Sequence, residues 1–259
     1  MLTALITGAS VGIGKSFAEK LAANGTNLVL VARSGSKLAK LRQKIQEKYN
    51  VKTEIIVQDL TEPDACNNVF NITQGKNLTI DLLVNNAGFG DYGEFAQRDG
   101  EQQIKMLQLN VLALVDLTHK YLPLMQMRNK GSIINISSIS GFQPIPYFSV
   151  YAASKAFVLH FSEALWAENK HYGVRVLAVC PGPTDTNFFT AADLPMDVVR
   201  KANSISTPEE VVNNALNSLE KGKSIAVTGG FINQAIVNIS RFLPREMTVK
   251  ILSKLFSSL

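Results

Sequence analysis

Residues 2–14 read LTALITGASVGIG, an apolar, β-branched run that leads directly into three glycines, Gly8, Gly12 and Gly14. The apolar run predicts a buried strand, and the residues that follow have the periodicity of a helix. A glycine-rich turn from strand to helix lets the backbone approach a phosphate, and the free N–H groups and dipole of the helix start favour an anion. This stretch therefore predicts the first strand–helix unit of an α/β fold, with a dinucleotide site on its turn.

Similar apolar runs recur along the chain and alternate with stretches of helical periodicity. Most runs are continuously apolar, which is typical of parallel strands covered on both faces. The sequence therefore predicts a Rossmann-like, doubly wound parallel α/β sheet of about seven strands with helices on both faces. The expected strands span residues 2–7, 27–32, 52–58, 82–84, 132–137, 174–179 and 224–228, and the clearest helices span 14–24, 37–49, 101–128 and 151–172.

Composition excludes several functional classes. Apolar residues make up 46% of the chain and charged residues 18%, as in a packed globular protein. The net charge is +5, but the basic residues are scattered, which argues against nucleic acid as a partner. Cys66 and Cys180 lack metal-ligand spacing, so we expect no metal site and a reducing, cytoplasmic location. The first strand starts at Leu2 and no run reaches the roughly 20 apolar residues of a membrane span, so neither a signal peptide nor a span is expected.

The glycine turn has one rival interpretation. Gly14, Lys15 and Ser16 end like the phosphate-binding loop of nucleotide triphosphatases. That loop also requires a glycine five residues before Gly14, where the chain has Ala9. We therefore prefer a dinucleotide site to a triphosphate site.

The end of the second expected strand bears on the choice of cofactor. In dinucleotide-binding folds an acidic residue near this point binds the ribose 2′-hydroxyl of NAD, whereas here the strand is followed by Arg33. A guanidinium matches a 2′-phosphate that a carboxylate would repel. We therefore predict NADP(H) as the preferred cofactor and NAD(H) as the alternative, with Arg33 and either Ser10 or Ser34 at the phosphate. The competing interpretation is that Arg33 is only a solvated loop charge.

Two segments carry the candidate chemistry. Tyr151 and Lys155 are four residues apart, so a helix places them on one face. A phenol with an ordinary pKa of about 10 becomes a usable acid or base when a nearby ammonium lowers that pKa. An expected strand ends in Ile136, Ser137 and Ser138, and a hydroxyl at this edge of the sheet can donate to a developing oxyanion. The sequence alone does not separate the two serines.

These motifs together resemble the short-chain dehydrogenase/reductase family, in its short single-domain, NADP-preferring branch. They occur in family order, and the resemblance covers about residues 1–230. Val11 departs from the pattern, because some NADP-preferring members carry a basic residue there. The matching segments are residues 7–14, 59–60, 85–88, 110, 136–138, 151–155 and 181–184.

The resemblance implies a role for each matching residue. Ser138 would hold the substrate oxygen and Tyr151 would exchange its proton. Lys155 would lower the phenol pKa and bind the nicotinamide ribose, while Asn110 would anchor a water of a proton relay. The cofactor groove would include Asp59 at the adenine, a nicotinamide frame at residues 181–186, and the whole set Gly8, Ser10, Gly12, Ile13, Gly14, Arg33, Asp59, Leu60, Asn86, Ala87, Gly88, Tyr151, Lys155, Pro181, Gly182, Thr184 and Thr186.

Residues 185–206 lie where the family carries a substrate lid, and they are rich in apolar side chains. An apolar pocket suits a hydrophobic carbonyl or alcohol substrate. The alternatives are that these side chains are ordinary core or subunit contacts, and that the chain is a non-catalytic NADP-binding sensor or scaffold. The lid candidates are Phe188, Phe189, Leu194, Pro195, Met196 and Val198, with Phe89, Phe142, Pro144 and Phe148 facing them.

The expected domain, residues 1–230, is followed by a tail of residues 231–259 that departs from family members ending after the last strand. Its apolar residues fall on helical faces, so it is expected to dock on the domain or on a second subunit of a homodimer or homotetramer. Weak contact with a membrane surface is the alternative. The two faces are Ile232, Ile236, Ile239, Phe242 and Leu243, then Ile251, Leu252, Leu255 and Phe256.

Overall fold

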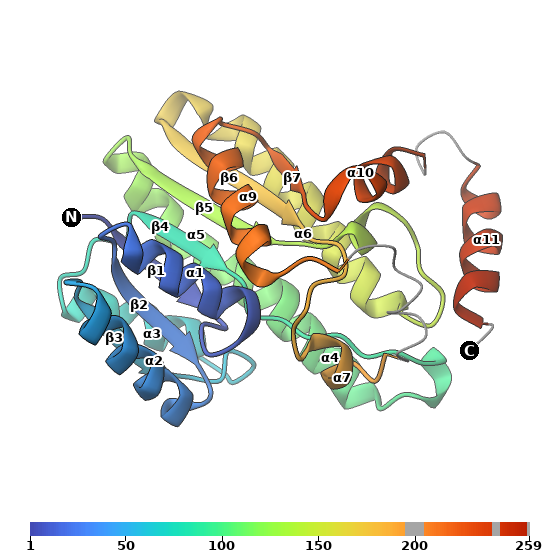
Figure 1. The fold of residues 1–259 in the computed structure, drawn as a ribbon, viewed down its shortest axis with the longest axis horizontal. Helices are drawn as coiled ribbons and strands as arrows, with labels where there is room; N and C mark the ends of the chain where they lie inside the picture. The colour runs from blue at the N-terminus through green and yellow to red at the C-terminus, as the bar shows by residue number, and fades with distance from the viewer. Residues whose placement is uncertain (195–204, 240–243, 258–259) are drawn as a thin grey trace.

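The computed structural model describes residues 1–194, 205–239 and 244–257. These residues form a seven-stranded sheet in the order β3-β2-β1-β4-β5-β6-β7, and every neighbouring pair is parallel (Figure 1). The predicted doubly wound sheet is therefore confirmed. The strands are β1 (Thr3–Thr7), β2 (Asn27–Ala32), β3 (Thr53–Val57), β4 (Leu82–Asn85), β5 (Gly131–Ile136), β6 (Val174–Cys180) and β7 (Ile225–Val227).

Helices cover both faces of this sheet because successive strand residues point to opposite sides. Ala4 and Ile6 of β1 join the core under α1, α2 and α9, whereas Leu5 joins the core under α3, α5 and α6. These helices are α1 (Gly12–Ala23), α2 (Gly35–Lys48), α3 (Ala65–Gly75), α5 (Ala113–Met127), α6 (Ser149–Glu168) and α9 (Pro208–Glu220). Shorter elements are η1 (Phe95–Gln97), η3 (Ile139–Phe142), η4 (Lys170–Tyr172) and α7 (Phe188–Ala191).

The single helix expected over residues 101–128 is divided into three parts. α4 (Gly100–Leu107) passes into a π-helical turn, η2 (Gln108–Leu112), and then into α5. A π-turn inserts one extra residue into a helix and is frequent at functional sites. This turn carries Asn110, which sequence periodicity placed on an uninterrupted helix.

The described residues of the tail form two helices, α10 (Gly230–Ile239) and α11 (Arg245–Ser257), at the end of the molecule beyond β7 (Figure 1). Phe242 and Leu243 lie outside the described residues, as do the side chains of Ile239 and Leu255. Within the described parts of the chain, none of the helices combines the length and the apolarity that a bilayer span requires.

Candidate active site

The carboxyl ends of β1 and β4 form the point where the chain reverses its direction across the sheet. Ligands of open α/β sheets bind outside such a point. Here the hydroxyl of Thr7, the last residue of β1, accepts hydrogen bonds from the backbone N–H groups of Asn86 and Ala87, both at 3.0 Å. The side-chain amide of Asn86 in turn donates to the carbonyl oxygen of Thr7 at 2.9 Å. These bonds tie the glycine turn to the end of β4.

The glycine turn is packed so closely that two of its positions require glycine. Gly8 has a φ of +63°, and a Cβ there would lie 2.8 Å from the side-chain nitrogen of Asn86. A Cβ on Gly14 would overlap the carbonyl oxygen of Gly8. The helix α1 then starts after Val11, whose side chain has no hydrogen-bond acceptor. Its first-turn N–H groups are thus available to an anion.

A cavity of about 860 Å³ runs from this turn along the edge of the sheet. Among the predicted catalytic and cofactor-binding residues, all but Gly14 and Asn110 line it. Gly14 lies under the turn and shapes it. The lining residues from the prediction are Gly8, Ser10, Gly12, Ile13, Arg33, Asp59, Leu60, Asn86, Ala87, Gly88, Ser138, Tyr151, Lys155, Pro181, Gly182, Thr184 and Thr186.

Arg33 and Asp59 stand at one end of the cavity. The Arg33 side chain is 76% exposed, and its Nη1 lies 3.7 Å from Oδ2 of Asp59. Burial raises the pKa of Asp59, but hydrogen bonds from Thr61 and the Arg33 charge outweigh burial, so this pKa is lowered overall. Lys37 lines the same end and was missed by the sequence reasoning, although a second cation so soon after Arg33 was a readable signal.

Tyr151 and Lys155 lie in the first half of α6, buried and facing the cavity. The Lys155 ammonium donates to the carbonyl oxygen of Ile136 at 2.9 Å and lies 5.7 Å from the centroid of the Tyr151 ring. The two serines left open by the sequence have different surroundings. The Ser138 hydroxyl lines the cavity with Tyr151 and accepts a hydrogen bond from the backbone N–H of Ser140 at 3.1 Å. The Ser137 hydroxyl instead donates to the carbonyl oxygen of Lys155 at 2.7 Å.

The pKa values of this pair depart from the expectation. Burial raises the pKa of Tyr151 to about 12, and the nearby Ser138 hydroxyl offsets this only in part. Burial also lowers the pKa of Lys155 to about 8. The Lys155 ammonium, which donates to the Ile136 carbonyl oxygen, is not among the groups that lower the pKa of Tyr151, so burial decides the direction of the shift. In the chain alone Tyr151 is therefore a protonated phenol at neutral pH, which is a proton donor.

Asn110 lies behind the cavity wall. Its side-chain oxygen accepts from the backbone N–H of Phe89 at 3.1 Å. Its side-chain nitrogen donates to the Phe89 carbonyl oxygen at 2.9 Å and to the Ser154 hydroxyl at 3.2 Å. Asn110 of the π-turn thus joins the loop after β4 to α6. Its contact on α6, Ser154, lies between Tyr151 and Lys155 in the sequence. The predicted relay role of Asn110 stays a prediction.

The other end of the cavity is aromatic and apolar. The ring of Phe148 stacks on Tyr151 with centroids 4.3 Å apart, and Phe188 lies 5.3 Å from the same ring. Of the remaining predicted pocket residues, Phe89, Phe189 and Leu194 line the cavity. Phe142 and Pro144 do not, and Phe142 packs against a core cluster instead. Pro195, Met196 and Val198 lie outside the described residues.

Hydrogen bonds join the two ends of the segment predicted as a lid, residues 185–206. The backbone N–H of Asp185 donates to the Ser206 carbonyl oxygen, and the N–H of Ser206 donates to the Pro183 carbonyl oxygen, both at 2.9 Å. The two ends of the segment are therefore held together directly after β6. In its first part, Phe188 of α7 packs on the Tyr151 side of the cavity.

Comparisons with known proteins identify the family of this chain. The family model described as short chain dehydrogenase matches residues 2–196. The chain is 38% identical to a very-long-chain 3-oxoacyl-CoA reductase of Rattus norvegicus over 95% of its own length and 77% of the rat protein. It is 34% identical to a 7beta-hydroxysteroid dehydrogenase of Collinsella aerofaciens over 90% of its length and 88% of that protein.

Two solved structures extend the comparison to three dimensions. A short-chain dehydrogenase from Sphingobium yanoikuyae in complex with NADPH is 33% identical, with a TM-score of 0.81 over 88% of this chain and 87% of that one. A 7beta-hydroxysteroid dehydrogenase structure is 30% identical, with a TM-score of 0.87 over 97% of this chain and 96% of that one. The chain therefore belongs to the short-chain dehydrogenase family and is an NAD(P)-dependent oxidoreductase.

Proposed function

We propose that the protein is an NADP(H)-dependent oxidoreductase that moves hydride between the nicotinamide and a carbonyl or alcohol group of an apolar substrate, with Tyr151 as the general acid and base. The observation that carries this proposal is the convergence of Ser138, Tyr151 and Lys155 on one wall of a cavity that continues to the glycine turn. A cofactor stretched from the turn to this wall would end beside the Tyr151 hydroxyl.

The chain's own residues would handle the proton. When bound, the nicotinamide supplies the hydride in reduction and accepts it in oxidation. In reduction the Tyr151 hydroxyl gives its proton to the substrate oxygen, while the Ser138 hydroxyl donates a hydrogen bond to the same oxygen. The Lys155 ammonium, held by Ile136, would bind the nicotinamide ribose and stabilise the phenolate that remains.

The preference for NADP(H) is supported by cations at the far end of the cavity. Arg33 is largely exposed and its guanidinium is paired with Asp59 only at 3.7 Å, so its donors are accessible to a phosphate. Lys37, Ser10 and Ser34 line the same end and offer further donors. A 2′-phosphate brings two negative charges that this group of residues can bind.

The preference for an apolar substrate is supported by the rings around Tyr151. Phe148, Phe188 and Phe189 supply the wall facing the reactive hydroxyls. A pocket of this kind binds apolar bodies and uses a few polar groups to orient them. The names of the relatives, very-long-chain 3-oxoacyl-CoA reductase and 7beta-hydroxysteroid dehydrogenase, likewise describe substrates with large apolar parts.

The test is a panel of ketones, 3-oxoacyl thioesters and sugars, each followed by the loss of NADPH absorbance. We expect oxidation of NADPH with apolar carbonyl compounds and little with sugars. Turnover confined to polar carbonyls would contradict the substrate class, and faster turnover with NADH would contradict the cofactor preference.

The assembly and the domain limits belong to the same proposal. We place the catalytic unit at residues 1–230, the lid at 185–206 and an accessory tail at 231–259, in a cytoplasmic homodimer or homotetramer. Ile104 and Leu112 on the α4–α5 segment and Phe157 on α6 are exposed, as expected for a subunit contact through these helices. Light scattering of the purified protein would give the oligomeric state.

A further inference from the structure

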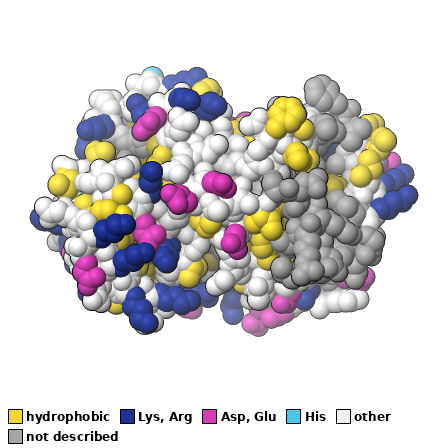
Figure 2. Space-filling model, in the orientation of Figure 1, with side chains coloured by type: hydrophobic (Ala, Val, Ile, Leu, Met, Phe, Trp, Pro, Cys, Tyr) yellow, Lys and Arg dark blue, Asp and Glu magenta, His cyan; other side chains and the backbone are white. Residues whose placement is uncertain are grey.

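The last helix, α11, contributes to the cavity although it lies far from the sheet. Figure 1 shows it at the edge of the molecule, beyond α10. Among the side chains of α11 that the structure describes, four line the cavity that also contains Tyr151, namely those of Thr248, Ile251, Leu252 and Phe256. The remaining side of the helix faces outward, with Met247 50% exposed and both Lys250 and Lys254 exposed. Apolar and basic side chains are visible at this edge in Figure 2.

A hydrogen bond joins α11 to the body of the protein. The Tyr92 hydroxyl donates to the backbone carbonyl oxygen of Phe256 at 2.8 Å. The Tyr92 ring lies 6.2 Å from that of Phe148, which in turn stacks on Tyr151. The ring of Phe256 packs against the same cluster. The helix is thus joined to the aromatic wall of the reactive centre.

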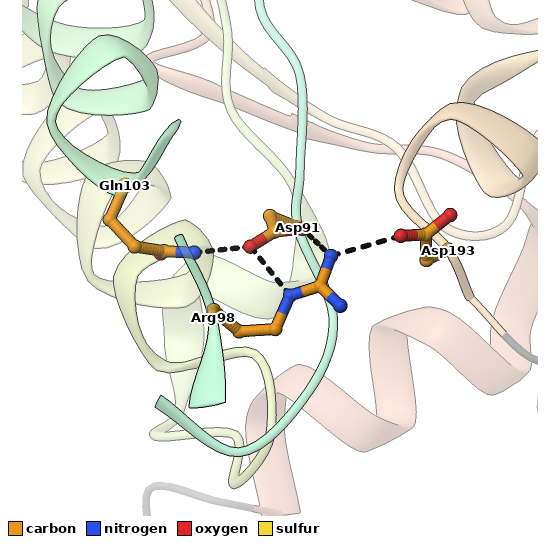
Figure 3. A network of polar contacts seen from close by, with 4 residues as sticks. All are labelled: Asp91, Arg98, Gln103 and Asp193. Atoms are coloured by element: carbon orange, nitrogen blue, oxygen red, sulfur yellow. Dashed lines mark hydrogen bonds and ion pairs between the residues drawn. The ribbon is translucent and has the colours of Figure 1, made fainter. Parts of the chain in front are cut away.

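Asp91 and the backbone of Tyr92 connect this tether to the lid. Asp91 is buried and receives hydrogen bonds from Arg98 and Gln103, and Arg98 also pairs with Asp193 of the lid at 2.9 Å (Figure 3). The backbone N–H of Tyr92 donates to the carbonyl oxygen of Ala192 at 2.9 Å. The loop after β4 therefore holds the start of the lid and the end of α11 at the same place.

We propose that α11 is the outer wall of the substrate pocket and that Tyr92 is the positioning residue that holds it there. The substrate class that fits is a carbonyl compound whose apolar chain runs from Tyr151 to the inner face of α11. This inference rests on the proposed function. Each methylene group that reaches an apolar wall and leaves water should raise kcat/KM roughly threefold to fourfold.

The first test measures kcat/KM of the full-length protein for a series of straight-chain methyl ketones of rising length with NADPH. For the unaltered protein we expect kcat/KM to rise with each methylene until the chain is longer than the pocket. Leu252→Asp, on the inner face, should lower kcat/KM at least tenfold for the longest ketones and have its smallest effect on the shortest. Met247→Asp, on the outer face of the same helix, is the matched control. In this variant kcat/KM should rise with ketone length as in the unaltered protein.

The second test isolates the tether. Tyr92→Phe removes one hydroxyl and keeps the ring, so it should raise KM severalfold for long ketones while kcat stays nearly constant. It should also speed cleavage by trypsin after Arg245, Lys250 and Lys254, which mass spectrometry identifies. A residue needed only for the general fold would instead lower activity equally for ketones of every length.

The outcomes separate the two proposals. If no carbonyl compound oxidises NADPH in the unaltered protein, the proposed function fails. Suppose that short ketones are reduced, but that kcat/KM depends on chain length in the same way in Leu252→Asp and Met247→Asp. Then α11 is not a wall of the substrate pocket, while the proposed function stands. If Tyr92→Phe leaves both KM and the trypsin cleavage unchanged, the tether is wrong. Leu252→Ala, which adds no charge, replaces Leu252→Asp if the melting temperature shows that the latter does not fold.

Discussion

The two ends of the cavity are built in different ways. The cofactor end is made of backbone: a turn of glycines, the N-terminus of α1, and strand ends tied together by Thr7 and Asn86. The substrate end is made of side chains from four segments that are far apart in sequence, contributed by Phe89, Phe148, Phe188 and Leu252 among others.

This difference predicts how each end responds to change. A backbone site depends on close approach, so one added methyl group has no room to be accommodated. A site of apolar side chains loses affinity in steps as contacts are removed, because each contact contributes separately. The cofactor end should therefore fail abruptly under substitution, whereas the substrate end should change its selectivity.

The largest effect is expected from Gly14→Ala, because its Cβ would overlap the carbonyl oxygen of Gly8. Affinity for NADPH should fall by more than about 100-fold, and the melting temperature should fall as well. Gly75→Ala is the control, because a Cβ there meets nothing within 4 Å. A thermal-shift titration with NADPH checks both variants. Equal binding by the two would refute the claim that close packing defines this end.

The next effect separates the two serines. Ser138→Ala should lower kcat by about 100- to 1,000-fold if this hydroxyl holds the developing oxyanion. Ser137→Ala should instead cost about 1 kcal/mol of stability, because it loses only the hydrogen bond to the Lys155 carbonyl oxygen. Steady-state kinetics and urea unfolding measure the two quantities. The reverse pattern would assign the reactive role to Ser137.

A third effect concerns stability and pH. Burial lowers the pKa of Lys155 to about 8 from 10.5, so between these pH values the unfolded chain holds a proton that the folded chain has released. Stability conferred by this residue should therefore rise with pH across that interval, by on the order of 3 kcal/mol. Lys155→Met should remove the rise. Urea unfolding of both proteins from pH 7 to 10.5 measures this difference. If the free energy of unfolding changes with pH in parallel in the two proteins, Lys155 does not lose its proton early in the folded chain.

The smallest effect is expected at the exposed cation of the cofactor end. Arg33→Ala should lower kcat/KM for NADPH by about 10- to 100-fold and leave the value for NADH nearly unchanged. Arg42→Ala, which removes the same charge from α2 outside the cavity, is the control. An equal loss with both cofactors would show that Arg33 does not recognise the 2′-phosphate.

Features that depend on local sequence could be predicted, whereas contacts between distant segments could not. The sheet, the glycine turn and the Tyr151–Lys155 pair follow from local rules of periodicity and spacing, and the structure has them where they were expected. The partners of Ser137 and Ser138 depend on how β5 meets α6, which spacing does not encode. The π-turn at Asn110 and the bond between Tyr92 and Phe256 join segments that only the folded chain brings together. Such long-range contacts leave no local pattern in the sequence.

The central claim is that Tyr151 transfers the proton while hydride moves to or from the nicotinamide. The most direct measurement compares Tyr151→Phe with the unaltered protein in ketone reduction and in NADPH binding. We predict that kcat falls by at least about 100-fold while the dissociation constant for NADPH changes less than about threefold. Retained turnover by the phenylalanine variant would contradict the claim.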